Sequence, residues 1–479
     1  MTLTQITTAG IKDNAVNHNK IPDNAVGSSE LADNAVDTAA IADDAVTTDK
    51  IADSAVTVNR IGNGAVTEVK LGTGAVTAAK IGSGQVTTAK IATDAVTQAK
   101  INIPLSNRNL IVNGAMNVAQ RGTSTTAANS YGTVDRFATI SSGLNEATTK
   151  SQADIASGTT PYTLGFRKSL KIQNGNQTGG ASATDYVSIR YRIEAQDVAQ
   201  SGWDYTSASS FITLSFWVKS SVAQNFYGRL LTNDGSVYSY PFETGSLSAD
   251  TWTKVTKTIP GNSNLTVNND NGIGLQLHIT QFWGTNYTDN SVTLNQWGAH
   301  NGTQRVPDYT TTWYLTNDAT FELTGVQLEV GSVATQFEHR SFSEELARCQ
   351  RYCYVTPYGG SSTATAGNEE HIQGASAYNA SADVVGQSKS MVAMFTFPQP
   401  MRSTPTYTGS NTNAKFRSSN TSNNFQLNGL SSFNNKTKSN IRSMTFSFTI
   451  GAPASMDGST AGFLEFNAAG GFVKFESEI

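Results

Sequence analysis

Aromatic residues are absent from the first quarter of this 479-residue chain, and the first of them is Tyr131. Cysteine is almost absent too. Only Cys349 and Cys353 occur, so disulfide bonds do not hold the fold together. Charged residues make up 15% of the chain, below the roughly 25% of ordinary globular domains. The net charge is −4 and no basic run is present, which argues against a nucleic-acid-binding protein.

Long apolar runs are missing as well. No segment approaches the ~20 apolar residues of a membrane-spanning helix. The N-terminus lacks the basic-then-apolar pattern of a secretory signal peptide. We therefore expect a soluble chain made in the cytoplasm of the producing cell. Serine, threonine, asparagine and glycine are abundant, which is typical of short strands joined by polar turns.

A ten-residue motif is repeated without insertion or deletion through the first hundred residues. Each unit opens with Ile or Leu, from Ile11 to Ile91, and has a valine five positions later. Such a short fixed period is typical of units that stack on their neighbours. One chain of this composition has too little apolar surface to offset about 1–2 kcal/mol of backbone entropy per residue. Because disorder would not require so strict a register, we predict a trimeric fibrous shaft over residues 1–102.

Polar positions of the repeat predict its local geometry. The third and fourth positions tolerate tight turns and positive φ, as in Asp43-Asp44 and Asn63-Gly64. The tenth position is often basic, and we expect these basic ends to lie near the acidic turns. A helical turn through residues 87–90 is an alternative that the sequence leaves open. Residues 1–60 carry nine acidic and four basic residues. This excess is either drift among solvated positions or a docking surface for another protein.

Beyond a linker at residues 103–108, short apolar segments alternate with breaks rich in Gly, Asn, Asp and Ser. This spacing predicts a two-sheet β-sandwich over residues 109–340. The predicted strands are 186–193, 211–218, 226–231, 252–259, 273–280, 313–315 and 321–330.

A short connecting helix is predicted over residues 341–354. Ser341 and Glu344 form a capping box at its start. Cys349 and Cys353 then fall on one helical face, together with Phe342 and Leu346. Two thiols without further cysteines or a histidine pattern are a poor zinc signature, so we interpret them as buried small side chains.

The remaining residues, 355–479, predict a smaller, sandwich-like β-domain at the tip. Their loops are rich in Asn, Ser and Thr. Strand signals return at 391–397, 425–427, 443–450, 462–466 and 472–475.

Three segments carry a family resemblance: NLIVNGAMNVAQRGTS from Asn109, YGTVDRF from Tyr131, and LTGVQLEVGSVATQFEHRSFSEELARCQRYCYV from Leu323. Together they resemble a jelly-roll domain of bacteriophage tail fibres, which is similar to carbohydrate-binding modules. In those modules an early strand pairs with a final VQLE-like strand. The ten-residue repeats resemble tail-fibre repeats independently, so the resemblance covers roughly residues 1–354. The segment FTFPQPMRSTP from Phe395 resembles one that often follows this domain.

The resemblance implies a homotrimeric phage tail fibre, a virion protein made in the host cytoplasm. It would bind a host surface polysaccharide or lipopolysaccharide and join another tail protein through its N-terminal end. Neither nucleic-acid binding nor membrane insertion is implied. We predict no cofactor, although the resemblance leaves room for a structural cation in the jelly roll. The chain departs from the family pattern at Cys353, where an aromatic is usual, and at Met116-Asn117, where Phe and an acid are common.

Two other functional classes stay open: a short tailspike depolymerase that hydrolyses host polysaccharide, and a purely structural tail spacer. The five histidines are scattered, and no nucleophile elbow or phosphate-binding loop occurs. A glycosidase needs two facing acids about 5–10 Å apart. Glu322 and Glu329 lie in the closing strand, and their sequence positions do not show whether they face each other. A binding or structural role is therefore favoured over catalysis.

Five aromatic residues in turn-like stretches are the candidates for sugar contact: Trp203, Tyr205, Trp283, Tyr287 and Trp297. Flat rings pack on the CH face of a sugar, while neighbouring amides bind its hydroxyls. The alternative is that these rings plug the ends of the sandwich. Trp217 and Trp252 lie mid-strand and are predicted to be core residues.

Overall fold

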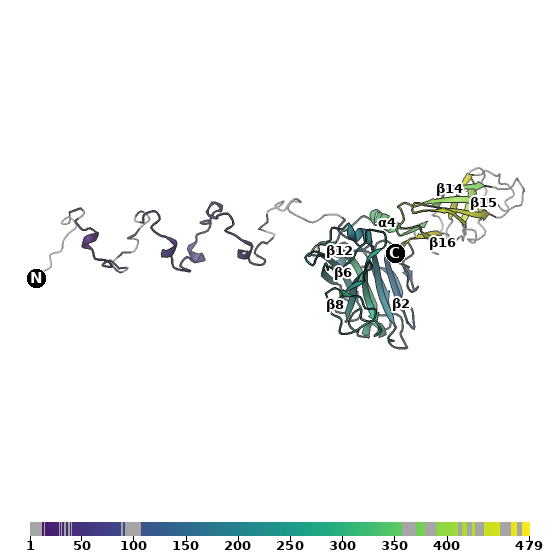
Figure 1. The fold of residues 1–479 in the computed structure, drawn as a ribbon, viewed down its shortest axis with the longest axis horizontal. Coiled ribbons are helices and arrows are strands. Elements are labelled where there is room, and N and C mark those ends of the chain that lie inside the picture. The colour runs from purple at the N-terminus through teal and green to yellow at the C-terminus, as the bar shows by residue number, and fades with distance from the viewer. Residues whose placement is uncertain are drawn as a thin grey trace. The chain divides into compact units, whose positions relative to one another are not determined.

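A computed structural model describes residues 12–13, 15–27, 29, 31–32, 35–36, 39, 41–87, 90–91, 107–356, 370–378, 389–410, 414–418, 424–426, 435–450, 461–466 and 472–479. The chain divides into two compact units, Met1–Asn102 and Ile103–Ile479 (Figure 1). No helix in the described ranges is long and apolar enough to cross a membrane. The finer boundaries at residues 108, 340 and 354 stay predictions.

The described repeats share one local backbone. A turn over the second to fifth positions is closed by a hydrogen bond, such as the one from Ala45 N to Ala42 O at 3.0 Å. The fourth position has the predicted positive φ, 63° at Asp44 and 78° at Gly64. A 3-10 turn ends five of the units: η2 (His18–Lys20), η3 (Thr48–Lys50), η4 (Val58–Arg60), η5 (Glu68–Lys70) and η6 (Ala78–Lys80).

The lysines at the tenth position fold back on their own units. Lys50 Nζ donates to the carbonyl of Ala45 at 2.8 Å, and the same bond recurs in other described units. These basic ends therefore lie beside the turns of their own units, and the group that Lys50 and Lys20 contact there is a backbone carbonyl. The apolar side chains stay half exposed, 43% at Ile41 and 56% at Val46. We call the residues at the first and sixth positions of the described units, which are Ile, Leu or Val, the apolar stripe. A single chain leaves this stripe half exposed.

The second unit is mainly β, and every strand pair in its described sheets is antiparallel. Two six-stranded sheets form a sandwich (Figure 1). Sheet A has the order β1 (Ser124–Thr125), β3 (Thr149–Asp154), β4 (Lys168–Gln173), β12 (Thr320–Val330), β6 (Phe211–Ser220), β9 (Thr253–Pro260). Sheet B has the order β11 (Gly298–Ala299), β8 (Tyr238–Ser246), β7 (Asn225–Thr232), β10 (Ile273–Trp283), β5 (Tyr186–Glu194), β2 (Phe137–Ser142).

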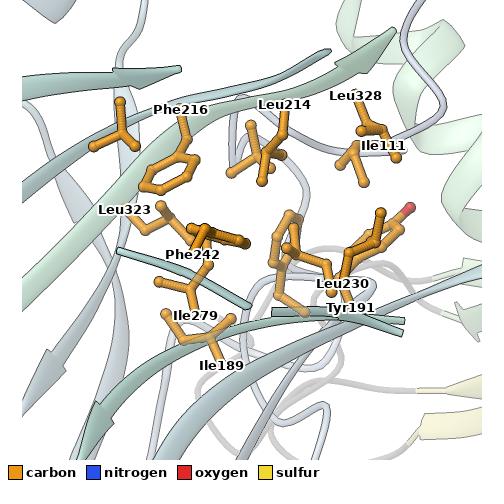
Figure 2. Packing of buried hydrophobic residues seen from close by; sticks show 14 of the residues in the cluster. Ile111, Ile189, Tyr191, Leu214, Phe216, Leu230, Phe242, Ile279, Leu323 and Leu328 are labelled. Atoms are coloured by element: carbon orange, nitrogen blue, oxygen red, sulfur yellow. The ribbon is translucent and has the colours of Figure 1, made fainter. Parts of the chain in front are cut away.

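The core lies between these two sheets. Leu214 and Phe216 of β6 point toward Ile189 of β5 and Ile279 of β10, and all four are buried (Figure 2). Successive residues of a strand point to opposite faces, so the residues between these core positions lie on the outer faces. This alternation determines which side chains can meet a ligand.

Short helices connect the strands: α1 (Thr160–Thr163), α2 (Ala195–Ala199), α3 (Thr312–Leu315) and α4 (Phe342–Gln350). The predicted strand at 313–315 is wrong, because this segment forms α3. Trp313 and Tyr314 are neighbours and both are fully buried, whereas Leu315 is 47% exposed. One helical turn accommodates two adjacent buried rings, which the alternation of a strand does not.

Helix α4 begins at the predicted cap. Ser341 Oγ accepts a hydrogen bond from Glu344 N at 3.3 Å. Among the described residues, the Glu344 carboxylate contacts Arg348 at 3.4 Å rather than completing the predicted capping box. Both thiols are buried and free, as predicted for small buried side chains. The prediction that Cys353 shares the helical face of Cys349 is wrong, because α4 ends at Gln350 and Cys353 begins the strand β13 (Cys353–Thr356).

The segment after Asn109 lies against β12. Leu110 N donates to Leu328 O at 2.9 Å, and Val326 N donates to Gly114 O at 3.0 Å. A Cβ atom on Gly114 would lie 2.0 Å from the Val326 oxygen, so the close approach requires glycine. The early segment therefore contacts the closing strand through backbone hydrogen bonds, but the pairing of two strands that the resemblance implied is wrong, because residues 109–117 form turns rather than a strand.

Two further sheets contain the C-terminal strands. A three-stranded sheet has the order β13 (Cys353–Thr356), β22 (Phe472–Glu476), β16 (Thr406–Ser410). A seven-stranded sheet has the order β18 (Asn424–Gln426), β17 (Ala414–Ser418), β21 (Ala461–Phe466), β14 (Glu370–Tyr378), β15 (Lys389–Thr396), β20 (Ser443–Ile450), β19 (Asn435–Ser439). The five strands predicted in this region overlap β15, β18, β20, β21 and β22.

Candidate ligand-binding face

The outer face of sheet B carries a row of basic side chains. Arg190 of β5, His278 of β10 and Arg229 of β7 are direct cross-strand partners. Their chain neighbours Ile189 and Ile279 point into the core. The three basic residues therefore project from the opposite face, side by side across three strands.

Hydrogen bonds fix the next residues along this face. Arg192 Nε donates to Gln276 Oε1 at 2.8 Å, which leaves the Gln276 amide nitrogen 2.8 Å from His278 Nε2. An amide nitrogen only donates, so His278 Nε2 is the acceptor and the ring proton resides on Nδ1, 3.4 Å from Ser188 Oγ. Burial and the surrounding arginines lower the pKa of His278, which agrees with this neutral form.

Aromatic rings lie against the arginines at one end of the row. Arg229 Cζ is 4.8 Å and Arg305 Cζ 5.3 Å from the ring centre of Trp283. Arg305 Cζ is also 4.4 Å from the ring of Tyr287, which packs edge-on against Tyr186 at 5.8 Å. These cation–π contacts hold the guanidinium planes in place without neutralising their charge.

A hollow of about 170 Å³ adjoins Arg305. Its lining is mostly polar and includes Ser239, Ser291, Gln296, Asn301 and Gln304. Hydroxyl and amide groups offer both donors and acceptors, so the hollow can bind the hydroxyls of a polar ligand beside the basic row.

The electrostatic environment of this face is strongly positive. Arg229 Nη1 lies 3.3 Å from His300 Nδ1. Burial, together with Arg229 and Arg305, lowers the pKa of His300 to about 4. Burial and Arg305 lower the pKa of Arg229 to about 9. Each shift reflects the cost of placing positive charge where water is scarce and other cations are close.

Four arginines on this face have no carboxylate oxygen within 4.0 Å in the described part of the chain: Arg190, Arg192, Arg229 and Arg305. The Nε atoms of Arg190 and Arg229 are buried and make no hydrogen bond there.

Two of the five aromatics predicted to contact sugar belong to this face. Trp283 is 1% exposed beneath the two arginines, and Tyr287 is partly exposed at the rim. They come from the end of β10 and the loop that follows it. Their role in sugar contact stays a prediction.

The other three predicted aromatics lie elsewhere and pack against the core. Trp203 is buried and donates through Nε1 to Ser210 O at 3.3 Å, and the Tyr205 ring lies 6.2 Å from it. Trp297 donates through Nε1 to Pro260 O at 2.7 Å. Packing accounts for all three, and the structure does not bring them together with Trp283.

Trp217 and Trp252 do not lie in the main core, where they were predicted. Because β6 directs Phe216 inward, Trp217 points to the outer face of sheet A. Both tryptophans pack against a small satellite cluster that includes Phe166. Trp217 also lines a second hollow of about 210 Å³, together with Phe337.

The two carboxylates of the closing strand are already engaged. Glu322 pairs with Lys219 at 2.9 Å, and Glu329 accepts a hydrogen bond from Thr335 N at 2.8 Å. Within the described ranges, no group of three or more His, Cys, Asp or Glu residues is placed to hold a metal ion.

The residues around the first segment do not fit a structural cation. Met116 is fully buried. The Asn113 amide group donates to the carbonyls of Val118 and Asp135 at 2.9 and 3.0 Å, and its oxygen accepts from Val118 N. The Asp135 carboxylate is itself bonded by Gln120. These oxygens therefore serve internal hydrogen bonds.

No protein-family model matches the sequence, and no curated protein matches it. Partial similarity extends to the enzymatically active domain of tailspike protein 4 from bacteriophage CBA120, with 9% identity and a TM-score of 0.25. That match covers 47% of this chain but only about a fifth, 21%, of the tailspike chain.

Two carbohydrate-binding modules are similar at the same level. The N-terminal cellulose-binding domain of β-1,4-glucanase C from Cellulomonas fimi has 10% identity and a TM-score of 0.21, covering 46% of this chain and 99% of that one. The family 11 module from Clostridium thermocellum has 12% identity and a TM-score of 0.20, covering 45% and 99%. Scores this low do not define a shared fold for the whole chain.

Proposed function

We propose that this protein is a bacteriophage tail fibre that attaches the virion to its host by binding a cell-surface glycan. The outer face of sheet B carries the proposal, because guanidinium, amide and hydroxyl groups converge there beside aromatic rings. Sugars present the complementary chemistry, since their hydroxyls take hydrogen bonds and their CH faces pack on rings.

The exposed rim of this face supplies the proposed contacts. Tyr287 offers a partly exposed ring, and Arg305 offers donors beside it. The amides of Gln296, Asn301 and Gln304 line the adjoining hollow. Trp283 supports the arginines from below because it is almost fully buried.

The repeats would form a three-chain shaft that holds the binding units away from the particle. The half-exposed Ile and Val of each described unit support this arrangement, because only other chains can cover them. Three linked sites bind a multivalent surface far more tightly than one, without any new contact. The N-terminal end of the shaft would join another tail protein, and the mature protein would reside in the virion.

Binding of the full-length protein to host cells and to a bacterial glycan array tests this function. Tyr287→Ala should weaken retention about tenfold, the effect of losing one aromatic packing contact of about 1.4 kcal/mol. Arg167→Gln is a control in the other sheet, because Arg167 directly precedes β4 of sheet A. Like Arg305, Arg167 lies over a tyrosine ring, with its Cζ 3.9 Å from the ring centre of Tyr162. Equal losses in both variants, or no retention by the intact protein, would refute the assignment. New reducing ends released from host polysaccharide would instead identify a depolymerase.

A further inference from the structure

We infer that the glycan carries an anionic group, a carboxylate or a phosphate, which binds on the outer face of sheet B between Arg229 and Arg305. This inference rests on the proposed glycan-binding function and narrows its ligand to an acidic saccharide.

The first argument is the contrast between this face and other buried or partly buried arginines of the same unit. Arg121 and Arg136 both contact the Glu478 carboxylate, and Arg351 donates two hydrogen bonds of 2.7 Å to Glu194. A buried cation is costly unless it is paired, so such pairing is the ordinary solution. On the sheet B face the partner is missing from the described residues.

The second argument is the burial of Arg229. Its side chain is 3% exposed, and its Nε atom is buried without a hydrogen-bond partner in the described part of the chain. Its Nη1 atom faces neutral His300, which cannot compensate the charge. The Trp283 ring orients the group but leaves its positive charge in place.

The third argument is that two cations converge. The guanidinium carbons of Arg229 and Arg305 both lie within 5.3 Å of the same Trp283 ring centre. A guanidinium group presents a planar fork of N–H donors that suits the oxygens of carboxylate and phosphate. The two charges also act on each other, because Arg305 contributes, after burial, to the lowered pKa of Arg229. An oxyanion bound at the partly exposed Arg305 would therefore offset positive charge near both groups.

The surroundings favour a single anionic group on a sugar over the repeated phosphates of a nucleic acid. Glu243 lies opposite Tyr227 on the same outer face, one row along from Arg229. Together with Asp308 it contributes to the raised pKa of Tyr227, after burial. A polyanion that follows the sheet would meet these carboxylates, whereas one acidic sugar would not.

The test compares acidic and neutral members of a bacterial glycan array with the full-length protein. The array carries uronic-acid glycans, phosphorylated glycans and their uncharged counterparts. We expect at least tenfold stronger retention on the acidic members, with the preference declining as salt is added. The uronic-acid and phosphorylated arms distinguish the two sources of charge.

Arg305→Gln should abolish the preference for acidic members, whereas Arg167→Gln should keep it. Because Arg229 is buried, Arg229→Gln can also unfold the protein, so its retention is measured only at a temperature at which the variant is fully folded. The result for the partly exposed Arg305 therefore decides the test. Equal retention of acidic and neutral glycans would overturn the inference and leave the glycan-binding function standing. Absence of retention on every glycan would overturn both. Binding of a single-stranded oligonucleotide as strong as that of acidic glycans would also contradict the inference.

Discussion

Arg121 Nε donates a 2.8 Å hydrogen bond to Glu476 Oε1, although 355 positions separate the two residues in the chain. Arg121 also bonds Glu478 at 2.9 Å, and Arg136 contacts the other oxygen of that carboxylate. Glu476 and Glu478 are thus tied to the start of the sandwich. We therefore expect Glu476 and Glu478, which belong to the predicted tip domain, to stabilise the preceding sandwich.

Replacing Glu478 should therefore destabilise the sandwich itself. Glu478→Gln leaves the buried Arg136 without its carboxylate partner, whereas Arg121 keeps Glu476 and Asp135. We expect a loss of about 3–5 kcal/mol in the free energy of unfolding. Urea denaturation followed by tryptophan fluorescence measures it. Lys474→Gln is the control, because it removes only the more exposed pair with Glu476 and should cost about 1 kcal/mol or less. Similar losses in the two variants would contradict this view of the C-terminal segment.

Acidification should lower the stability of the folded protein, because His300 takes up a proton more readily in the unfolded chain. Its pKa is lowered from 6.5 in the unfolded chain to about 4 in the fold by burial, Arg229 and Arg305. The unfolded chain therefore binds the proton more readily, and the stability falls as the pH drops from about 6.5 to about 4.

Melting temperature measured across that pH range checks this expectation. His300→Gln should show a smaller decline than the wild type over the same interval, since it removes the titrating group. An identical decline in the two proteins would show that His300 is not responsible.

Substitutions of the aromatic candidates should affect either the stability of the protein or its retention on glycans. Trp203→Ala removes a ring that is 3% exposed, and we expect it to cost about 3–5 kcal/mol of stability. Glycan retention per folded molecule should be unchanged. Tyr287→Ala should do the reverse, weakening retention with little change in the urea midpoint. If Trp203→Ala lost retention while remaining stable, the site would lie at the other end of the sandwich.

Association of the repeats is directly measurable. Light scattering of the intact protein should give three times the chain mass of 50.9 kDa. Val66 and Val69 offer a matched pair within one unit, because Val66 belongs to the half-exposed stripe at 52% and Val69 is 96% exposed. Val66→Asp should shift the protein toward smaller species or lower its dissociation temperature, and Val69→Asp should not. A monomeric mass for the wild type would contradict the proposed shaft.

The sequence predicted the elements in which apolar residues recur at a regular spacing. Strands β5, β6 and the part of β10 up to Ile279 have an apolar residue at every second position, and β12 does so on either side of a register shift between Thr324 and Gln327. The predicted ranges of all four agree with the structure. The segment that forms α3 is too short to show a period, and its adjacent rings suggested a strand. Positive φ at Asp44 was predictable because few residue types tolerate it.

The basic row was not predicted, although its signal was present. Arginine alternates with core residues in IRYRI at residues 189–193, and polar residues do so in LQLHI at 275–279. Each pattern by itself predicts an ordinary solvated strand face. Only the register that places Arg190, His278 and Arg229 opposite one another concentrates the charge, and pairing between distant strands is not encoded in either segment alone.

Strand β13 pairs with β22, so that Cys353 lies opposite Glu476 and Thr356 opposite Val473. The polypeptide consequently departs for residues 357–471 and comes back at adjacent positions. A replacement for this excursion would need two ends roughly 5 Å apart. It would also have to reproduce the hydrogen bonds that Arg402 makes with Asn271 and Arg351. Exchange of this excursion between related chains would therefore require a compatible contact at Arg402 as well as two compatible joints.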